Sequence, residues 1–318
     1  INDDPLLAKK LNADGCHLGQ KDMDLTKARK ILKNKIIGVT CHNSIDLAKT
    51  AIKAGADYLL SLKESTLWIA DEVSSTPVLI PDRHADMKSL FNAIEKFSSI
   101  GRTFYADPIL DPIHFGFTES IIRYHELREK YPDIKIIMGV GNLTELTEAD
   151  TTGINAILFG LISEMNLNAV LATEVSAHCR SAVREADIAR RIFYAAKKDN
   201  SLPKGLDGSL LGMHERRPFQ YDTDEIEEFY RDVKDPSYRI QVNEDGIHVY
   251  NRDGISASMN PFDLFPELDL LQEDAPHAFY MGVELARAQI ALQLGKKYMQ
   301  DEELDWGVAT NRRTEEQK

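Results

Sequence analysis

Short apolar runs alternate with helical patterns over the first two thirds of the chain. Each run is bounded by turn-forming residues, which is typical of short strands buried on both faces. With a remnant at Ile1 and Asn2, the pattern predicts eight strands, at residues 1–2, 15–19, 35–40, 57–62, 76–80, 103–106, 134–140 and 169–175.

Helical periodicity separates these strands. The clearest helix is predicted just before Gly101, from an apolar stripe of period 3.6 at Met87, Leu90, Phe91, Ile94 and Phe97. Two more are predicted at residues 44–55 and 176–198, the second rich in arginine.

Strands separated by one helix each indicate βαβ units. Residues 1–199 are therefore predicted to form an α/β domain, a (β/α)8 TIM-type barrel. The chain enters it in mid-strand, so we expect the barrel to be incomplete at its N-terminus. An open, doubly wound parallel sheet is the alternative. In both architectures the functional residues lie at the carboxyl ends of the strands.

The pattern changes at the Leu-Pro-Lys-Gly string of residues 202–205, and a small α+β region is predicted from there to residue 306. It contains an acidic helix at 224–233 and a hairpin that turns at Asp245 and Gly246. The tail, residues 307–318, is polar and expected to be disordered. The apolar face of the hairpin is Ile240, Val242, Ile247 and Val249.

A last helix is predicted at residues 278–299. Its apolar stripe should pack on the barrel, or on a second copy of the chain in a homodimer. The stripe consists of Phe279, Val283, Ala286, Ile290 and Leu294.

Composition narrows the class of protein. The net charge of -13 argues against a duplex nucleic-acid surface, and no apolar run approaches the roughly 18 residues that a membrane span needs. Cys16, Cys41 and Cys179 lie far apart and form no CxxC pair, which indicates reduced thiols. We expect a cytoplasmic enzyme that acts on small molecules and binds neither nucleic acid nor membrane.

Two acidic residues stand just past the ends of neighbouring predicted strands. Asp3 follows the first strand and Asp22 follows the second, so both carboxylates would face one mouth of a barrel. Such a pair suits Mg²⁺, which completes its shell with water and substrate phosphates. The alternative is that both residues are helix N-caps or loop charges.

The surrounding motifs resemble a known family. Asn-Asp-Asp at residues 2–4, His-Leu-Gly-Gln-Lys-Asp at 17–22 and Gly-Val-Thr-Cys-His at 38–42 resemble the middle of thiamine phosphate synthases. These (β/α) barrel enzymes join a pyrimidine-methyl diphosphate to a thiazole phosphate. The resemblance implies Mg²⁺ as cofactor, with Asp3 and Asp22 as ligands, and places Asn2 and Thr40 near the diphosphate or pyrimidine. It ends at about residue 59.

A second acidic block follows the strand predicted at 103–106. Asp107 and Asp111 each precede a proline, which keeps the loop rigid and extended. A buried carboxylate there can accept N–H bonds from a flat amino-heterocycle, and its charge favours a cationic transition state. We expect Phe115 and Phe117 to line the same cleft. The alternative is that the aspartates cap the loop.

These residues resemble another family. Leu-Asp-Pro-Ile-His-Phe-Gly-Phe at residues 110–117 is similar to a strand-end motif of dihydropteroate synthases. Together with Gly-Asn-Leu-Thr-Glu-Leu-Thr at 141–147, it more closely resembles a divergent pterin-binding group linked to tetrahydromethanopterin synthesis. The resemblance covers about residues 55–306. It implies that Asp111 binds the pterin and that Asn142 lies near a lysine position of ordinary synthases.

This chain differs from the pterin-binding family at positions that form the family's substrate pocket. Its third-strand aspartate falls near Thr40, and its eighth-strand arginine and histidine fall at Leu171 and Thr173. The candidates to substitute for the lost side chains are His178, Arg180 and Arg184, of which Arg184 is our choice for substrate binding.

The two resemblances meet at residues 54–60, and we interpret the chain as a chimera rather than an evolved fusion. In both families a heteroaryl-methyl diphosphate loses pyrophosphate and a nitrogen nucleophile captures the carbon. The predicted function is a transferase that joins a dihydropterin-methyl diphosphate to an arylamine, in folate or tetrahydromethanopterin biosynthesis. The alternatives are thiamine phosphate synthase and a non-catalytic pterin-binding protein or inactive chimera.

Overall fold

The computed structural model describes residues 1–41, 44–60, 62–72, 76–268, 270 and 274–309. The chain divides into two compact units, Ile1–Ser201 and Leu202–Lys318. The division falls where the helical pattern breaks, at the Leu-Pro-Lys-Gly string.

Unit 1 is built on parallel strands that pair in the order of the sequence. An isolated bridge adds Asn2 beside His17, and another joins Leu62 to Leu79. The predicted alternation of strands and helices is therefore confirmed, with the strand order of a (β/α) barrel. The strands are β1 (Gly15–Leu18), β2 (Ile36–Thr40), β3 (Tyr58–Leu60), β4 (Val78–Leu79), β5 (Tyr105–Ala106), β6 (Lys135–Gly139) and β7 (Ala169–Leu171).

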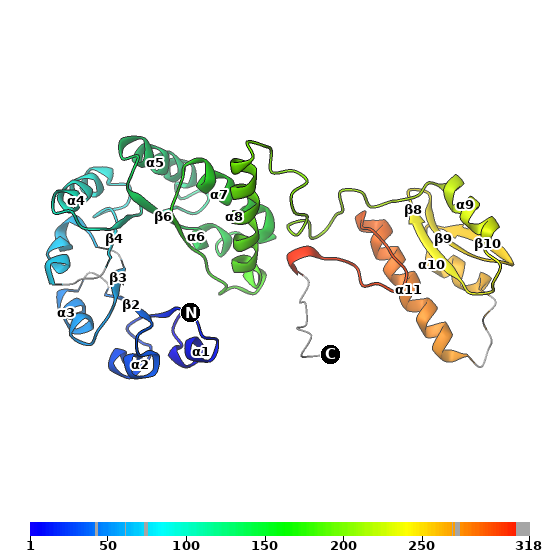
Figure 1. Cartoon of the computed structure of the whole chain (residues 1–318), viewed down its shortest axis with the longest axis horizontal. Coiled ribbons are helices and arrows are strands. Elements are labelled where there is room, and N and C mark those ends of the chain that lie inside the picture. The colour runs from blue at the N-terminus through cyan, green and yellow to red at the C-terminus, as the bar shows by residue number, and fades with distance from the viewer. Residues whose placement is uncertain (42–43, 61, 73–75, 269, 271–273, 310–318) are drawn as a thin grey trace. The chain divides into compact units, whose positions relative to one another are not determined.

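Helices connect successive strands of unit 1 (Figure 1). In the helix before Gly101, the predicted residues Leu90, Ile94 and Phe97 are buried against the strands. Within the described residues the strands form two sheets, β1-β2-β3 and β4-β5-β6-β7. There β7 pairs with β6 alone, so the strands do not close between β7 and Asn2. The helices are α1 (Pro5–Lys10), α2 (Leu25–Leu32), α3 (Ile45–Lys53), α4 (Met87–Ser99), α5 (Phe117–Lys130), α6 (Gly141–Thr144), α7 (Thr151–Glu164) and α8 (Ala182–Lys198), with a 3-10 segment η1 (Glu64–Glu72).

The helix predicted at 176–198 begins later than expected. A separate 3-10 turn, η2 (Ala177–Cys179), precedes α8. The backbone N–H groups of Val175 and Ser176 donate to the Glu145 carboxylate, which holds this stretch outside the helix.

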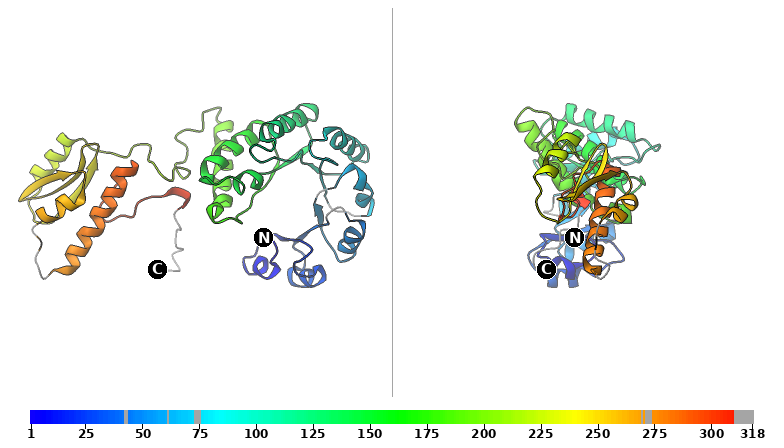
Figure 2. Two further views of the ribbon diagram at one scale, coloured as in Figure 1. Left: turned by 180° about the vertical axis from the view of Figure 1, so that it is seen from behind. Right: turned by 90° about the vertical axis from the view of Figure 1, so that its right-hand side faces the viewer.

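Unit 2 contains a three-stranded antiparallel sheet of order β10-β9-β8, with α11 (Ala275–Leu294) along it (Figure 2). The predicted hairpin is confirmed, because Val242 pairs with Ile247 and Asn243 with Gly246. The third strand was not predicted. The other elements are β8 (Arg239–Asn243), β9 (Gly246–Asn251), β10 (Gly254–Ser258), α9 (Thr223–Asp232), α10 (Pro261–Leu264) and η3 (Phe265–Glu267).

The face of α11 that packs on the sheet of unit 2 differs from the predicted apolar stripe. Phe279 is 75% exposed and Ile290 is exposed as well. The buried face includes Glu284, a charged residue that the apolar pattern placed in solvent, and Tyr298 donates a hydrogen bond to it at 2.7 Å. Gly295, with φ +60, ends the helix before residue 299. The buried residues are Met281, Glu284, Leu285, Ala288 and Ala291.

The prediction of a disordered tail is wrong for its first three residues. Gly307–Ala309 form a 3-10 turn, η4, in which Val308 is buried and its N–H donates to the carbonyl of Ser209 at 2.8 Å. Residues 310–318 lie outside the described residues. No described helix has the length and apolar character to cross a membrane.

Candidate functional site

Asp111 is a buried carboxylate in the loop that follows β5. Its Oδ2 accepts hydrogen bonds from Nη2 of Arg123 at 2.6 Å and from Nε2 of His84 at 2.9 Å. Arg123 lies on α5, whereas His84 lies in the loop between β4 and α4. The carboxyl ends of two neighbouring strands thus bring three charged or titratable side chains together.

Arg123 fixes the shape of this loop. Its guanidinium donates to the carbonyls of Pro108 at 3.3 Å and Ile109 at 2.9 Å, besides the bond to Asp111. Ile109 has φ +68, a conformation that a β-branched side chain rarely adopts. Such strain persists only where the surroundings enforce it, and here the arginine does so.

Two further residues place the Asp111 carboxylate. Gly116 has φ +114, and a Cβ there would lie 3.0 Å from Oδ2 of Asp111, so only glycine lets α5 start this close. Asn142, on α6, donates from Nδ2 to the carbonyl of Leu110 at 2.8 Å. The structure therefore brings the predicted residues Asp111 and Asn142 to the same loop. Asn142 contacts the backbone of that loop and not the Asp111 carboxylate.

Asp107 is engaged within the same loop. Its Oδ1 accepts from the hydroxyl of Tyr124 at 2.6 Å and from the N–H of Ile109 at 2.8 Å. Burial raises the pKa of Asp107 to about 6, although these two bonds and the charge of Arg123 lower it. Burial and the neighbouring Asp107 also raise the pKa of Tyr124. Both contacts of Asp107 hold the loop, and its substrate-binding role stays a prediction.

A second polar cluster lies at the carboxyl ends of the first strands. Asn2 pairs with His17, whose Nε2 lies 2.7 Å from Oγ1 of Thr40. The carboxyl of Asp22 lies near that of Asp3, and burial together with Asp22 raises the pKa of Asp3. The N–H of Gly19 donates to Oδ2 of Asp22 at 2.6 Å. All four residues predicted from the first block therefore gather around His17.

This cluster fits the kind of metal site that the sequence predicts. Two neighbouring carboxylates repel each other unless a divalent cation lies between them, and Mg²⁺ prefers such hard oxygen ligands. Among the described residues no group of three or more His, Cys, Asp and Glu could hold a metal. The remaining ligands would therefore be water and substrate phosphate. His42, which belongs to the same motif, lies outside the described residues.

The loop after β7 is attached to α6 through Glu145. Burial alone would raise the pKa of this carboxyl, but hydrogen bonds from Thr173, Val175 and Ser176 outweigh it and lower the pKa to about 2. Nε2 of His178 lies 3.1 Å from the carbonyl of Thr144, so this histidine also secures the loop.

The remaining predicted side chains point outward. Arg180 and Arg184 are exposed, and Phe115 is 76% exposed. Arg184 lies on the first turn of α8. The roles of these three residues in substrate binding stay predictions.

Sequence reasoning missed His84, Arg123, Tyr124 and His17. A signal for two of them was available, because Arg123 and Tyr124 occupy the buried face of α5 with Ser120 and Leu127. A polar pair within the buried stripe of a helix indicates an internal polar partner.

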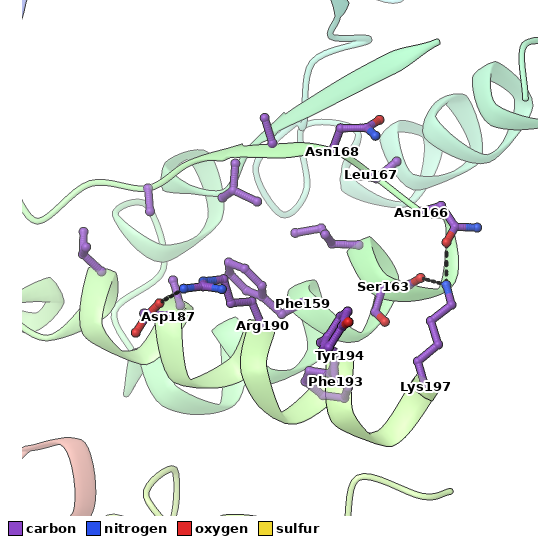
Figure 3. Close-up of a pocket in the computed structure, with 16 residues that line it drawn as sticks. Phe159, Ser163, Asn166, Leu167, Asn168, Asp187, Arg190, Phe193, Tyr194 and Lys197 are labelled. Carbon is purple, nitrogen blue, oxygen red and sulfur yellow. Dashed lines mark hydrogen bonds and ion pairs between the residues drawn. The ribbon is translucent and has the colours of Figure 1, made fainter. Parts of the chain in front are cut away.

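A separate hollow of about 510 Å³ lies between β7 and helices α7 and α8 (Figure 3). Phe159, Val170 and Phe193 contribute apolar walls, and none of the predicted site residues lines it. Two pairs of the labelled polar side chains contact each other: Asp187 pairs with Arg190, and Nζ of Lys197 donates to Asn166 at 2.6 Å.

Comparison with known proteins gives a family match for the first segment of the chain. Residues 1–61 match the family model of thiamine monophosphate synthase, which confirms the first resemblance. Fifty-nine residues, 19% of this chain, are 92% identical to 28% of the thiamine-phosphate synthase of Pelagibacter ubique. Sixty residues are 57% identical to 27% of the enzyme of Marinobacter nauticus.

A longer match covers most of the chain. This chain is 31% identical over 337 residues to the uncharacterized protein MJ0107 of Methanocaldococcus jannaschii. The match covers 94% of this chain and 62% of that protein. The chain thus spans less than two thirds of this relative and a much smaller share of the thiamine-phosphate synthases.

Solved structures of dihydropteroate synthases are also similar. That of Thermus thermophilus in complex with 4-aminobenzoate has a TM-score of 0.45 and 16% identity, over 62% of this chain and 91% of that one. The 7,8-dihydropteroate synthase of Vibrio fischeri has a TM-score of 0.41 and 12% identity, over 60% of this chain and 82% of that one.

Proposed function

We propose that this chain is a transferase of the dihydropteroate synthase-like type. It joins a dihydropterin-methyl diphosphate to an arylamine nitrogen and releases pyrophosphate. The observation that supports this proposal most is the buried Asp111, which Arg123 anchors at the carboxyl ends of the strands. It stands in the Leu-Asp-Pro motif that resembles the pterin-binding loop.

Asp111 suits recognition of a flat amino-heterocycle. Both of its protein contacts use Oδ2. In this proposal Oδ1 accepts N–H bonds from the pterin, and such charge-assisted bonds are strong in a site sheltered from water. As the diphosphate leaves, positive charge develops on the methylene carbon, and the fixed negative charge of Asp111 stabilises it.

The first cluster would handle the diphosphate. Asp3 and Asp22 would hold Mg²⁺, which when bound stabilises the negative charge of the leaving pyrophosphate. Asn2 and Thr40 lie beside the acid pair and would contact the same end of the substrate. Both clusters lie at the carboxyl ends of parallel strands of unit 1, which is where barrel enzymes bind their substrates.

We expect weak binding and slow turnover. The pterin-binding family has an arginine and a histidine where this chain has Leu171 and Thr173, and each buried polar group of the substrate left without a partner costs roughly 1 to 3 kcal/mol. Several such losses reduce the rate by many powers of ten.

Pyrophosphate release tests the proposed activity. The chain is incubated with dihydropterin-methyl diphosphate, 4-aminobenzoate and Mg²⁺. Slow release that depends on the arylamine, and that disappears in Asp111→Asn, supports the proposal. Asp199→Asn is the matched control, because Asp199 is exposed at the end of α8. Release on the order of 1 per second or faster would show that His178, Arg180 or Arg184 supply the missing contacts.

Thiamine phosphate synthase is the second candidate, which the match of residues 1–61 and the acid pair favour. The same assay with pyrimidine-methyl diphosphate and thiazole phosphate distinguishes it, because release would then require the thiazole. Binding of a dihydropterin with no release from either pair of substrates would indicate a non-catalytic pterin-binding protein.

A further inference from the structure

We propose that His84 is a catalytic residue of this site. It accepts the proton that the arylamine nitrogen loses on transfer, and Asp111 positions its imidazole. The inference rests on the proposed function. It goes further, because it assigns the proton acceptor to a residue that belongs to none of the motifs by which the chain resembles the two families.

Exposure separates His84 from its two partners. The side chain of Arg123 is 7% exposed and that of Asp111 is 8% exposed, whereas that of His84 is 64% exposed. A molecule that enters from solvent therefore meets the imidazole first. Arg123 is buried, and its Nε and Nη2 donate to the carbonyls of Pro108 and Ile109 and to the carboxylate of Asp111, so little of it is accessible to a substrate.

The hydrogen bond to Asp111 determines which ring nitrogen of His84 can act. A carboxylate only accepts, so Nε2 carries the hydrogen of the 2.9 Å bond. In the neutral imidazole the lone pair then lies on Nδ1. A carboxylate behind a histidine fixes the tautomer and the orientation of its ring.

The backbone on both sides of His84 is held in place. The N–H of Asp82 donates to Oγ of Ser89 at 2.9 Å, and Asp86 caps α4 by accepting from the N–H of Ser89 at 3.2 Å. Ala85 has φ +59, so the chain turns sharply after the histidine. A base held on a fixed turn loses little entropy when the substrate binds.

The proposed step balances as follows. The arylamine nitrogen attacks the methylene carbon, and the new C–N bond forms as the C–O bond to pyrophosphate breaks. The electron pair of that bond leaves with pyrophosphate. The N–H proton of the amine passes to Nδ1 of His84, and the Asp111 carboxylate stabilises the resulting imidazolium.

Asp107, the other carboxylate of this loop, is engaged within the protein, because it accepts from Tyr124 and Ile109. His178 lies at the C-terminal end of α6, with Nε2 against the carbonyl of Thr144. Nε2 of His17 contacts Thr40 in the other cluster.

Histidine ¹⁵N spectra of the full chain test the assignment. The non-reactive probe pair is 6-hydroxymethyl-7,8-dihydropterin, which has no leaving group, with 4-aminobenzoate. We expect one histidine signal that is absent in His84→Gln, and its Nδ1 resonance should shift when the pair binds. His125→Gln, at an exposed position of α5, should leave that signal unchanged. If calorimetry shows binding of the pair but the His84 signal does not move, the inference is wrong and the proposed function stands. If the parent binds neither probe, both are wrong.

Single-turnover release of pyrophosphate supplies the second readout. Glutamine in place of His84 keeps a donor for Asp111 but cannot accept the proton, so His84→Gln should be slower by about 10²- to 10⁴-fold with nearly unchanged KM. A purely structural role predicts instead that glutamine restores the parental rate, and that result would overturn the proposal.

Discussion

At the residue scale, the site depends on how two aspartates four positions apart are paired. Asp111 was predictable, because an aspartate followed by proline at a strand end indicates a carboxylate in the mouth of the barrel. Its partners were not predictable, because His84 lies 27 residues before it and Arg123 lies 12 residues after it. Local pattern carries no information on which side chains meet across that distance.

Asp107 should make the stability of the chain depend on pH. Its pKa rises from 3.8 to about 6 on folding, so the folded state holds the proton more tightly than the unfolded state. The stabilisation it contributes is full below about pH 4 and is lost as the pH rises to about 6.

Urea unfolding of the parent and of Asp107→Asn between pH 4 and 7 measures this effect. The parent's free energy of unfolding, relative to that of the variant, should fall over this range by on the order of 3 kcal/mol. A constant difference between the two proteins would show that Asp107 is not buried as described.

At the element scale, strands were easier to predict than the faces of helices. The runs that became β1 to β7 are local signals, and so is the hairpin turn at Asp245. No local signal indicated the buried face of α11, because that face depends on a hydrogen bond from Tyr298 to Glu284, a charged residue that the sequence pattern predicts to be exposed. The start of α8 likewise depended on Glu145, from another element.

Glu145 should stabilise the attachment of the β7 loop to α6. Its pKa falls from 4.5 to about 2 on folding, so its contribution is present above pH 4.5 and is lost as the pH falls toward 2. At pH 7, Glu145→Gln should cost about 1 to 3 kcal/mol, because the N–H groups of Val175 and Ser176 lose a charged acceptor.

Hydrogen exchange locates this effect. The amides of Val175 and Ser176 should exchange faster in Glu145→Gln than in the parent. The control Glu148→Gln, at a nearby exposed position, should leave their exchange unchanged. Unchanged exchange in Glu145→Gln as well would mean that the carboxylate does not hold the loop.

At the scale of the whole molecule, the two resemblances meet between the two parallel sheets of unit 1. β3 pairs with β2 in the first sheet, and an isolated bridge from Leu62 to Leu79 links the segment after β3 to β4 in the second. The predicted metal pair thus comes from the thiamine-synthase-like segment and the predicted pterin carboxylate from the remainder. The sequence predicted both sets because each belongs to a separate short motif.

Magnesium affinity tests whether the first segment contributes its site. In a calorimetric titration with pyrophosphate present, Asp22→Ala should bind Mg²⁺ at least tenfold more weakly than the parent, because one of two protein ligands is lost. Asp14→Asn, before β1, serves as the control. Equal affinity of Asp22→Ala and the parent would assign the acid pair to loop structure.

The central claim is that Asp111 binds the pterin, and one affinity measurement tests it most directly. Dihydropterin-methyl diphosphate is titrated calorimetrically, with Mg²⁺ present, into the parent chain and into Asp111→Asn. The account predicts binding by the parent and at least a tenfold weaker affinity for the variant, which corresponds to about 1.4 kcal/mol. Equal affinities, or no binding by the parent, would contradict it.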